Sequence, residues 1–334
     1  MAVEAAADPR VLVTWLGFDP EDPRTGARLR EAGLCVDLVP KTGTRSPADM
    51  ARLLRGAVAA IVSTDPIDRS VLQAASRLCV IARVGVGTDS IDLTAATEAG
   101  VVVTTTPGAN REATADHALA MILASVRRVV EHDASVRRGE WRRGGDLTPW
   151  ELHRRTVGLV GYGSIGQAVA RRLGGFDVEL LVCDPAARPR RGLAVVELPE
   201  LLRRADVVSL HAPLTEGTRR LIGGDELDLM RPASVLVNTS RGGLVDERAL
   251  VRALQAGRLR AALDVFAHEP GVPRALAELP NVVLSPHVGG LSERSIASMT
   301  EQATSHVLDA LRGAPDAAAV ANPAVLGRTR RAVA

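Results

Sequence analysis

The 334-residue sequence is poor in aromatic side chains, which make up 2% of it, and it contains only three cysteines. Cys35, Cys79 and Cys183 are far apart and each lies in or beside an aliphatic run, so we expect reduced, buried thiols rather than a disulfide framework. No apolar run approaches the ~20 residues of a membrane-spanning helix. Residues 1–10 are acidic and lack the basic and apolar regions of a secretory leader, which favours a cytoplasmic location.

An excess of either charge is also missing, because 41 Lys and Arg face 39 Asp and Glu, for a net charge of +2. This balance argues against nucleic acid and against a membrane surface as partners. Lys41 is the only lysine, so a catalytic lysine elsewhere is excluded. Apolar residues make up 46% and the mean hydropathy is +0.09, as in a folded protein with an aliphatic core. The length, about twice the ~150 residues of a typical domain, predicts two domains.

Short aliphatic runs alternate with longer mixed segments along both halves of the chain. This rhythm is typical of βαβ units and predicts two parallel sheets. The predicted strands of the first half are residues 11–16, 34–39, 57–63, 78–84 and 101–104. Those of the second half are residues 157–160, 179–183, 206–210, 234–238, 260–265 and 282–284.

Two long helices are predicted at the joins between the halves. Residues 111–130 place Ala118, Ile122 and Val126 on one face at helical spacing, so one continuous helix should link the two sheets. A second helix is predicted over residues 292–312, with Gly313 as its stop, and we expect it to return to the first domain.

A glycine-rich turn, GYGSIG at residues 161–166, follows the strand predicted at 157–160 and opens a helix. In such a fingerprint Gly161 permits the tight turn, Gly163 allows close approach of a pyrophosphate, and Gly166 lets the helix pack on the strand. The next strand ends at Asp184, where a carboxylate can accept hydrogen bonds from the adenosine ribose. The combination predicts a dinucleotide site.

The residue at position 184 also bears on the choice between NAD and NADP. The Asp184 carboxylate would repel a 2′-phosphate and therefore favours NAD. Arg188, Arg190 and Arg191 follow closely and offer the alternative of a phosphate-binding loop, although Pro185 and Pro189 are more typical of a solvated loop. NAD is the predicted cofactor.

Polar residues follow three predicted strands of the second half, at the sheet edge where open parallel sheets bind ligands. Arg241, Glu269 and His287 should therefore converge. An arginine fork binds a carboxylate, and a histidine held by a carboxylate can deliver a proton to a carbonyl group. The set suits reduction of a 2-keto acid, although each residue alone could be an ordinary surface residue. No chemistry is predicted for the histidines at 117, 132, 153, 268 and 306, and no cluster has metal-ligand spacing.

Seven motifs occur in order: RVGVGTD (83–89), TPGAN (106–110), GYGSIG (161–166), HAPLT (211–215), NTSRGGLVD (238–246), DVFAHEP (264–270) and SPHVG (285–289). Through them the sequence resembles the D-2-hydroxyacid dehydrogenase family over nearly its whole length, and especially the catalytic core of phosphoglycerate dehydrogenase. The resemblance implies two doubly wound, Rossmann-like α/β domains with the cofactor domain inserted in the substrate domain. Residues 8–109 plus 295–325 would form the substrate domain and residues 110–294 the dinucleotide-binding domain.

The resemblance also implies roles for individual residues. Arg241 would hold the substrate carboxylate, His287 would be the acid/base, and Glu269 would orient it. The substrate-binding turn would comprise Arg83, Val84, Gly85, Val86 and Gly87, whose glycines would also suit a plain strand-to-helix turn. The cofactor would contact Gly161, Gly163, Ser164, Ile165, Gly166, Asp184, His211, Ala212, Thr239, Ser240, Asp264 and Gly289. The family is dimeric, and Trp141 lies in the segment that reaches the partner, so a homodimer is expected.

Departures from the family pattern narrow the substrate. Where phosphoglycerate dehydrogenases carry an arginine for the substrate phosphate, this chain has Ser63 and Thr64. Arg83 and, from the partner subunit, Arg143 match other anion-binding positions, which leaves a second anionic group open. Glu269 and Val86 disfavour formate and phosphite as substrates. A non-catalytic, NAD-sensing interaction protein on the same fold is the alternative function.

Overall fold

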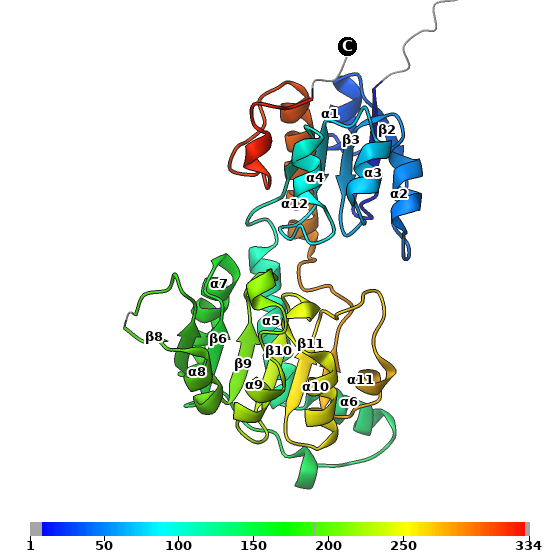
Figure 1. The fold of residues 1–334 in the computed structure, drawn as a ribbon. Coiled ribbons are helices and arrows are strands. Elements are labelled where there is room, and N and C mark those ends of the chain that lie inside the picture. The colour runs from blue at the N-terminus through cyan, green and yellow to red at the C-terminus, as the bar shows by residue number, and fades with distance from the viewer. Residues whose placement is uncertain (1–8, 190, 331–334) are drawn as a thin grey trace, which may run out of the picture. The chain divides into compact units, whose positions relative to one another are not determined.

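The computed structural model describes residues 9–189 and 191–330, which divide into two compact units. Unit 1 contains the described residues up to Asn110 and those from Ser292 onward, and unit 2 runs from Arg111 to Leu291. Unit 2 is therefore inserted between the two segments of unit 1, as the colouring of Figure 1 makes visible. Most of residues 1–10, on which the expectation about a leader rests, lie outside the described residues.

Unit 1 is built on a five-stranded parallel sheet with the strand order β2-β1-β3-β4-β5. Its strands are β1 Arg10–Val13, β2 Cys35–Leu38, β3 Ala57–Val62, β4 Val80–Arg83 and β5 Val102–Thr104. Its helices are α1 Gly26–Glu31, α2 Pro47–Leu54, α3 Arg69–Ala74, α4 Leu93–Glu98 and α12 Glu293–Leu311, with a 3₁₀ turn, η5, at Pro323–Val325. Apolar clusters cover both faces of the sheet, which explains why every residue of β3 is aliphatic and buried.

Unit 2 is built on a seven-stranded parallel sheet with the order β12-β11-β10-β9-β6-β7-β8. Its strands are β6 Thr156–Val160, β7 Glu179–Cys183, β8 Ala194–Val195, β9 Val207–Leu210, β10 Val235–Asn238, β11 Arg260–Leu263 and β12 Val282–Leu284. Its α-helices are α5 Arg111–Val126, α6 Val129–Arg137, α7 Ser164–Leu173, α8 Leu198–Arg204, α9 Gly224–Leu229, α10 Glu247–Gln255 and α11 Arg274–Ala277. Its 3₁₀ turns are η1 Gly145–Leu147, η2 Gly174–Phe176, η3 Glu216–Thr218 and η4 Gly242–Leu244. Two apolar clusters again cover the two faces of the sheet, so the predicted doubly wound parallel architecture is confirmed in both units.

The predicted continuous helix over residues 111–130 is wrong at its C-terminal end. Helix α5 ends at Val126, and Arg128 has a left-handed backbone, with φ at 52°. A new helix, α6, then starts at Val129 and carries Val129 and Val130 with exposed side chains. Valines occur on both sides of this break, but only Val126 packs in the core, whereas Val129 and Val130 are exposed. The sequence pattern of apolar residues therefore did not reveal the break.

Helix α12 runs from Glu293 to Leu311, close to the predicted range 292–312. Ser292 caps it by accepting a hydrogen bond from the Ser295 amide, and Gly313 follows it with φ at 80°. Met299, Ala303 and Val307 pack in one of the two apolar clusters of unit 1. The last long helix of the chain therefore belongs to the unit in which the chain starts.

The prediction of three buried thiols is wrong for one of them. Cys79 is buried and Cys183 is partly buried, but Cys35 is exposed at the start of β2, which is an edge strand of its sheet. None of the three is in a disulfide. Each helix in the described part of the chain is too short or too polar to span a bilayer.

Candidate active site

Three polar segments follow three neighbouring strands of the unit 2 sheet. Strands β10, β11 and β12 lie side by side and run parallel, so the residues that follow them emerge at one edge of the sheet (Figure 1). Arg241 follows β10, Glu269 follows β11 and His287 follows β12. The first two segments pack closely, because a Cβ atom on Gly242 would lie 2.0 Å from the Phe266 carbonyl carbon.

His287 and Glu269 form a directly hydrogen-bonded pair at this edge. The His287 Nδ1 atom lies 2.6 Å from Glu269 Oε2, and the two side chains are about one-third exposed, at 35% and 30%. The second carboxylate oxygen of Glu269 accepts a hydrogen bond from the Phe266 amide at 3.0 Å. With Nδ1 held in this way, Nε2 is the ring nitrogen left to face a substrate.

The charge of Glu269 is stabilised by its surroundings. Burial raises the pKa of this carboxyl group, but the hydrogen bond and charge of His287, the Phe266 amide and the charge of Arg241 outweigh it and lower the pKa below its ordinary value. Glu269 is therefore ionised at neutral pH. Since Arg241 contributes to this shift, its guanidinium lies within electrostatic range of the pair, as the sequence predicted for residues at this edge.

The Arg241 segment is shaped by its own neighbours. The Asn238 side chain donates to the Arg241 carbonyl at 2.9 Å and accepts from the Ser240 amide at 3.0 Å. The Ser240 hydroxyl donates to the Ala212 carbonyl at 2.8 Å, which ties the end of β10 to the end of β9. The Arg241 side chain itself donates to the Ser240 carbonyl at 2.7 Å. The turn that carries the guanidinium is thus fixed from both sides.

Asp264 holds the turn on which His287 lies. Its carboxylate accepts hydrogen bonds from the amides of Val288 and Gly289, at 3.0 and 2.8 Å, and from the Ser285 hydroxyl at 2.6 Å. Its backbone carbonyl accepts from the His287 amide at 2.8 Å. Burial raises the pKa of Asp264, but these hydrogen bonds and one from His117 outweigh it and hold the pKa at about 2. A buried, ionised carboxylate therefore sets the backbone around His287.

His117, for which the sequence predicted no chemistry, is part of this cluster. Its Nε2 atom lies 2.9 Å from Ser285 Oγ and 3.3 Å from Asp264 Oδ1. The sequence contained one usable signal, because His117 shares a helix face with Thr114 and Met121, both buried in α5. A histidine within a buried helical face needs a polar partner, but the pattern could not say which one.

The glycine-rich turn has the geometry that a dinucleotide pyrophosphate requires. Gly161 has φ at 95°, and a Cβ atom there would lie 2.6 Å from the Ala212 amide nitrogen. A Cβ atom on Gly166 would lie 2.4 Å from the Gly161 carbonyl oxygen, so neither position accepts a side chain. Gly163 caps α7 without any side-chain hydrogen bond and is exposed, as is Ser164, the first residue of this helix. The helix N-terminus is thus open to an anion.

Other predicted cofactor positions also lie at the carboxyl ends of the unit 2 strands. Burial lowers the pKa of His211 to about 4, so this imidazole, 3.0 Å from the Ser209 hydroxyl, is neutral at pH 7. The Thr239 hydroxyl is buried and has no hydrogen-bond partner among the described residues. A buried hydroxyl with spare hydrogen-bonding capacity beside the Arg241 turn suits a polar ligand. These residues fit a nicotinamide dinucleotide.

Asp184 lies directly after β7 and faces the glycine-rich turn. One of its carboxylate oxygens accepts from the Tyr162 amide and the other from the Ala186 amide, both at 2.7 Å. A carboxylate has about four acceptor positions, so lone pairs remain for ribose hydroxyls. Of the nearby arginines, Arg188 is exposed and donates to the Ala187 carbonyl at 2.8 Å, whereas Arg190 lies outside the described residues.

The turn predicted to bind substrate belongs to unit 1. Arg83 ends β4 and is buried, and its guanidinium donates to the Val84 carbonyl at 2.6 Å. Gly85 has φ at 119° and its amide donates to the Thr106 hydroxyl at 2.8 Å. Arg83 therefore lies under its own turn, while Val86 is exposed on it. Arg83, which was predicted to bind an anion, thus uses its guanidinium to support this turn.

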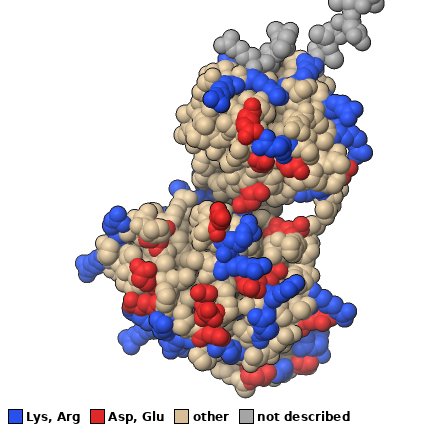
Figure 2. Space-filling model, in the orientation of Figure 1, with Lys and Arg blue, Asp and Glu red and all other residues tan. Residues whose placement is uncertain are grey.

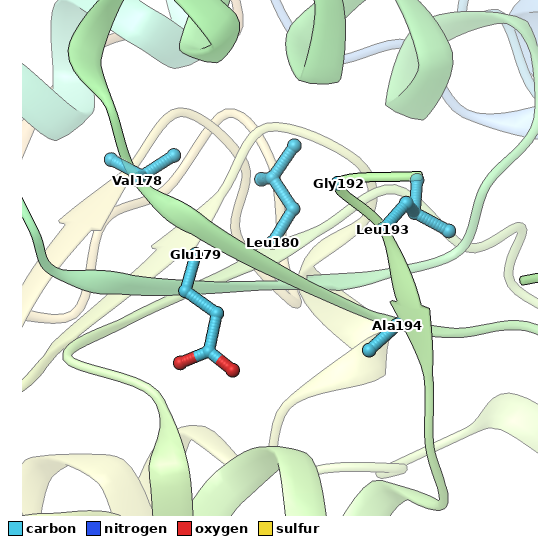
Figure 3. A pocket seen from close by; sticks show the side chains of 6 residues that line it. All are labelled: Val178, Glu179, Leu180, Gly192, Leu193 and Ala194. Atoms are coloured by element: carbon cyan, nitrogen blue, oxygen red, sulfur yellow. The ribbon is translucent and has the colours of Figure 1, made fainter. Parts of the chain in front are cut away.

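A recess elsewhere on unit 2 carries no comparable chemistry. It lies at the start of β7 against β8 and is lined by Val178, Glu179, Leu180, Gly192, Leu193 and Ala194, as Figure 3 shows. Glu179 is its one ionisable residue, and that carboxylate is bound to Arg204 and to the Thr156 hydroxyl. The recess is at the amino end of β7, away from the edge that carries His287.

Sequence comparisons agree with this geometry. The sequence profile of the "D-isomer specific 2-hydroxyacid dehydrogenase, NAD binding domain" matches residues 119–289. A glyoxylate reductase from Thermococcus litoralis is 41% identical over 263 residues, which cover 75% of this chain and 79% of that protein. A D-3-phosphoglycerate dehydrogenase from Mycobacterium leprae is 42% identical over 255 residues, but this match covers 47% of that longer protein.

A solved structure is similar over nearly the whole chain. It is that of an NADPH-dependent glyoxylate/hydroxypyruvate reductase from Sinorhizobium meliloti in complex with NADP and malonate. The two chains are 32% identical with a TM-score of 0.83, and the match covers 98% of this chain and 100% of that one. The chain belongs to the D-isomer specific 2-hydroxyacid dehydrogenase family and is a nicotinamide-dependent oxidoreductase of 2-hydroxy acids.

Proposed function

We propose that this enzyme uses NADH to reduce a short, unphosphorylated 2-keto acid, of the glyoxylate or hydroxypyruvate type, to the D-2-hydroxy acid. The hydrogen-bonded His287–Glu269 pair beside Arg241 is the observation that carries the proposal. Unit 2 would be the dinucleotide-binding domain and unit 1 the substrate domain. The relatives are named as enzymes and give no support to the NAD-sensing alternative.

The proposed reaction divides the work among three side chains. Arg241 binds the substrate carboxylate with its planar fork and so orients the neighbouring carbonyl group. A dinucleotide held at the glycine-rich turn of residues 161–166 would supply the hydride for the carbonyl carbon. His287 donates the proton on Nε2 to the carbonyl oxygen, and Glu269 holds the Nδ1–H and stabilises the imidazolium. One keto acid, one hydride and one proton thus give one hydroxy acid.

The absence of a phosphate on the substrate is argued from unit 1. Ser63 and Thr64 follow β3, and neither carries a charge. Nearby Arg45 is paired with the buried Asp65 at 3.2 Å and also donates to two backbone carbonyls. The Lys41 ammonium donates to the carbonyl and the hydroxyl of Thr64, each at 2.9 Å. Both cations therefore already have internal partners.

The substrate is tested by following NADH oxidation with glyoxylate, hydroxypyruvate, phosphohydroxypyruvate and pyruvate, and by chiral chromatography of the products. We expect kcat/KM to be at least about tenfold higher for hydroxypyruvate than for its phosphorylated form, which corresponds to ~1.4 kcal/mol. A preference for phosphohydroxypyruvate would contradict the unphosphorylated substrate. Failure to reduce any 2-keto acid would contradict the proposed activity.

Asp184 is expected to make the enzyme prefer NADH to NADPH. A 2′-phosphate beside this carboxylate is repelled, and a repulsion of only ~1.4 kcal/mol gives a tenfold preference in kcat/KM. Because the solved relative from Sinorhizobium meliloti is NADPH-dependent, the comparison of the two cofactors is informative. Asp184→Asn keeps an acceptor for a backbone amide but removes the charge. It should therefore reduce the ratio of kcat/KM with NADH to kcat/KM with NADPH. Equal kcat/KM values in the unaltered enzyme would overturn this assignment.

Glu269→Gln is expected to lower kcat for keto-acid reduction at neutral pH and to change how kcat falls on the acid side. The lowered pKa keeps Glu269 negative at neutral pH, so its carboxylate accepts the Nδ1–H of His287 and orients the ring. In the unaltered enzyme this support is complete above the ordinary pKa of a glutamate and is lost as the pH falls through the lowered pKa, whereas glutamine has no carboxyl group to titrate. The measurement is the pH profile of kcat in both directions. An unchanged kcat and an unchanged profile would make Glu269 a structural carboxylate only.

A homodimer is proposed from an apolar surface on unit 2. Val129, Val130 and Val136 of α6 are exposed, and Trp141 just beyond this helix is 80% exposed. Exposed apolar side chains gathered on one segment are typical of an interface. Light scattering should give a mass of about twice the 35.2 kDa of the chain, and a monomer at micromolar concentration would contradict the pairing.

We also propose a cytoplasmic location and a small anionic acid, rather than nucleic acid or a membrane, as the partner. A cytoplasmic location agrees with three cysteines outside disulfides, and cell fractionation would test it. On the face drawn in Figure 2, basic and acidic side chains are interspersed rather than gathered by sign. The face drawn there offers no large basic patch of the kind that binds nucleic acid or an anionic membrane. Binding to either at physiological salt would contradict that expectation.

A further inference from the structure

The proton on His117 can be placed from its neighbours. Asp264 is 1% exposed and ionised, so its carboxylate can only accept hydrogen bonds. The single hydroxyl proton of Ser285 is directed to the Asp264 carboxylate at 2.6 Å, because the other acceptor within reach, the Met121 sulfur at 3.8 Å, is weak. Toward His117 the same hydroxyl can therefore only accept, which means that the Nε2 atom of His117 carries a proton and donates it.

The cluster of His117, Ser285 and Asp264 is tightly packed. A Cβ atom on Gly289 would lie 2.8 Å from Asp264 Oδ2 and 3.1 Å from His117 Cδ2. Asp264 in turn binds the amides of Val288 and Gly289 and, through its carbonyl oxygen, the amide of His287. A shift of the Asp264 carboxylate would thus shift the turn that carries the proton donor.

The backbone of His287 needs this support. Its φ is 54°, in the left-handed region that residues other than glycine seldom adopt, and such a conformation persists only where the surroundings enforce it. Asp264 accepts the supporting hydrogen bonds from the amides of this turn. Among the described residues, His117 is the one donor to Asp264 and Ser285 from outside the 285–289 turn. The cluster also ties α5, the first element of unit 2, to the last turn before the chain leaves that unit.

We propose that His117 is a positioning residue for the reaction: its Nε2–H fixes the Ser285–Asp264 pair and thereby the turn that presents His287. The proposal rests on the proposed function for its kinetic consequence, but not for its structural one. His117 acts only through Asp264 and Ser285, and it takes no part in proton transfer to the carbonyl group.

Three substitutions of His117 test the proposal. Glutamine can place an N–H close to the position of histidine Nε2, asparagine places one nearer Nδ1, and phenylalanine fills the space without a donor. We expect kcat for keto-acid reduction to fall by about 10- to 100-fold in His117→Phe and His117→Asn, because a misplacement of about 1 Å can cost that much. The KM of the keto acid should change by less than about threefold, and His117→Gln should restore most of kcat.

The isotope effect on kcat, and the comparison of the glutamine and asparagine variants, separate a positioning role from a loss of folded enzyme. With NADH deuterated at the transferred position, the isotope effect on kcat should rise in His117→Asn, because a displaced proton donor makes the chemical step slower relative to the others. A variant that is merely less stable has fewer active molecules and keeps the isotope effect of the unaltered enzyme. If His117→Phe does not fold, the comparison of the glutamine and asparagine variants still decides the matter.

A further arm of the test uses NMR to measure the protonation of the His117 ring and amide exchange, and it does not depend on activity. In the unaltered enzyme the His117 ring should show a protonated Nε2, and the amides of Val288 and Gly289 should exchange slowly with solvent. In His117→Asn both amides should exchange faster, and in His117→Gln they should not. If no keto acid is reduced, the proposed function fails while this arm still tests the positioning. Unchanged amide exchange in His117→Asn, or equal kcat in the asparagine and glutamine variants, would overturn the role of His117.

Discussion

His287→Asn should lower kcat for keto-acid reduction by about 10²–10⁴-fold, the usual contribution of a positioned general acid. His287 is the one imidazole at the edge of the unit 2 sheet that is paired through Nδ1 to an ionised carboxylate, among the residues that the structure describes. Without it, the oxygen of the reduced carbonyl group must take its proton from water. The measurement is steady-state kcat with saturating NADH and keto acid.

Asparagine is the suitable replacement because it tolerates a left-handed backbone better than most residues, and φ at position 287 is 54°. The variant should therefore keep the turn and bind NADH with nearly unchanged affinity, which fluorescence titration can measure. His268→Asn provides the matched control, since His268 is exposed near Glu269 but outside the pair, and it should retain nearly full kcat. A His287→Asn enzyme within tenfold of full kcat would require a different proton donor.

The convergence at this edge could be predicted from the sequence because the information is local. Buried parallel strands such as β10 and β11 are continuous aliphatic runs, so their ends can be located from composition alone. In a parallel sheet those ends share one edge, and this rule alone predicts that Arg241, Glu269 and His287 converge. The pairing of His287 with Glu269 follows from the same rule and from their chemistry.

What composition could not predict depends on contacts between distant segments. The strand predicted over residues 11–16 ends at Val13, because Leu16 is exposed beyond the last paired residue, and aliphatic character alone cannot show where pairing stops. Strand β8 was missed because it has two residues on the edge of the sheet. The contacts of His117 join segments 147 to 168 positions apart, which no short motif records.

The left-handed backbone of His287 is equally invisible in the sequence. Histidine does not by itself require φ at 54°, and only the hydrogen bonds from the 287–289 amides to Asp264 explain it. The family resemblance implies that Asp264 faces the nicotinamide, and the structure adds that its carboxylate holds the turn that carries His287. One oxygen, Oδ2, accepts only the Gly289 amide among the hydrogen bonds described, so it retains capacity for a cofactor amide.

Arg241→Ala should lower kcat/KM for the keto acid by roughly 30- to 1,000-fold, equivalent to about 2–4 kcal/mol, the cost of removing one partner of a desolvated charge pair. Part of the loss should lie in KM, since the carboxylate loses its anchor, and part in kcat, since the carbonyl group is no longer oriented toward His287. Arg241→Lys keeps the charge but not the fork, so it should recover only part of kcat/KM. NADH affinity should change little in both variants, because Asn238 and Ser240 hold the Arg241 turn through backbone and side-chain groups that remain. If Arg241→Ala lost NADH affinity and kcat/KM equally, Arg241 would support the cofactor site rather than the substrate carboxylate. Full recovery of kcat/KM in Arg241→Lys would show that charge alone, without bidentate geometry, suffices to bind the acid.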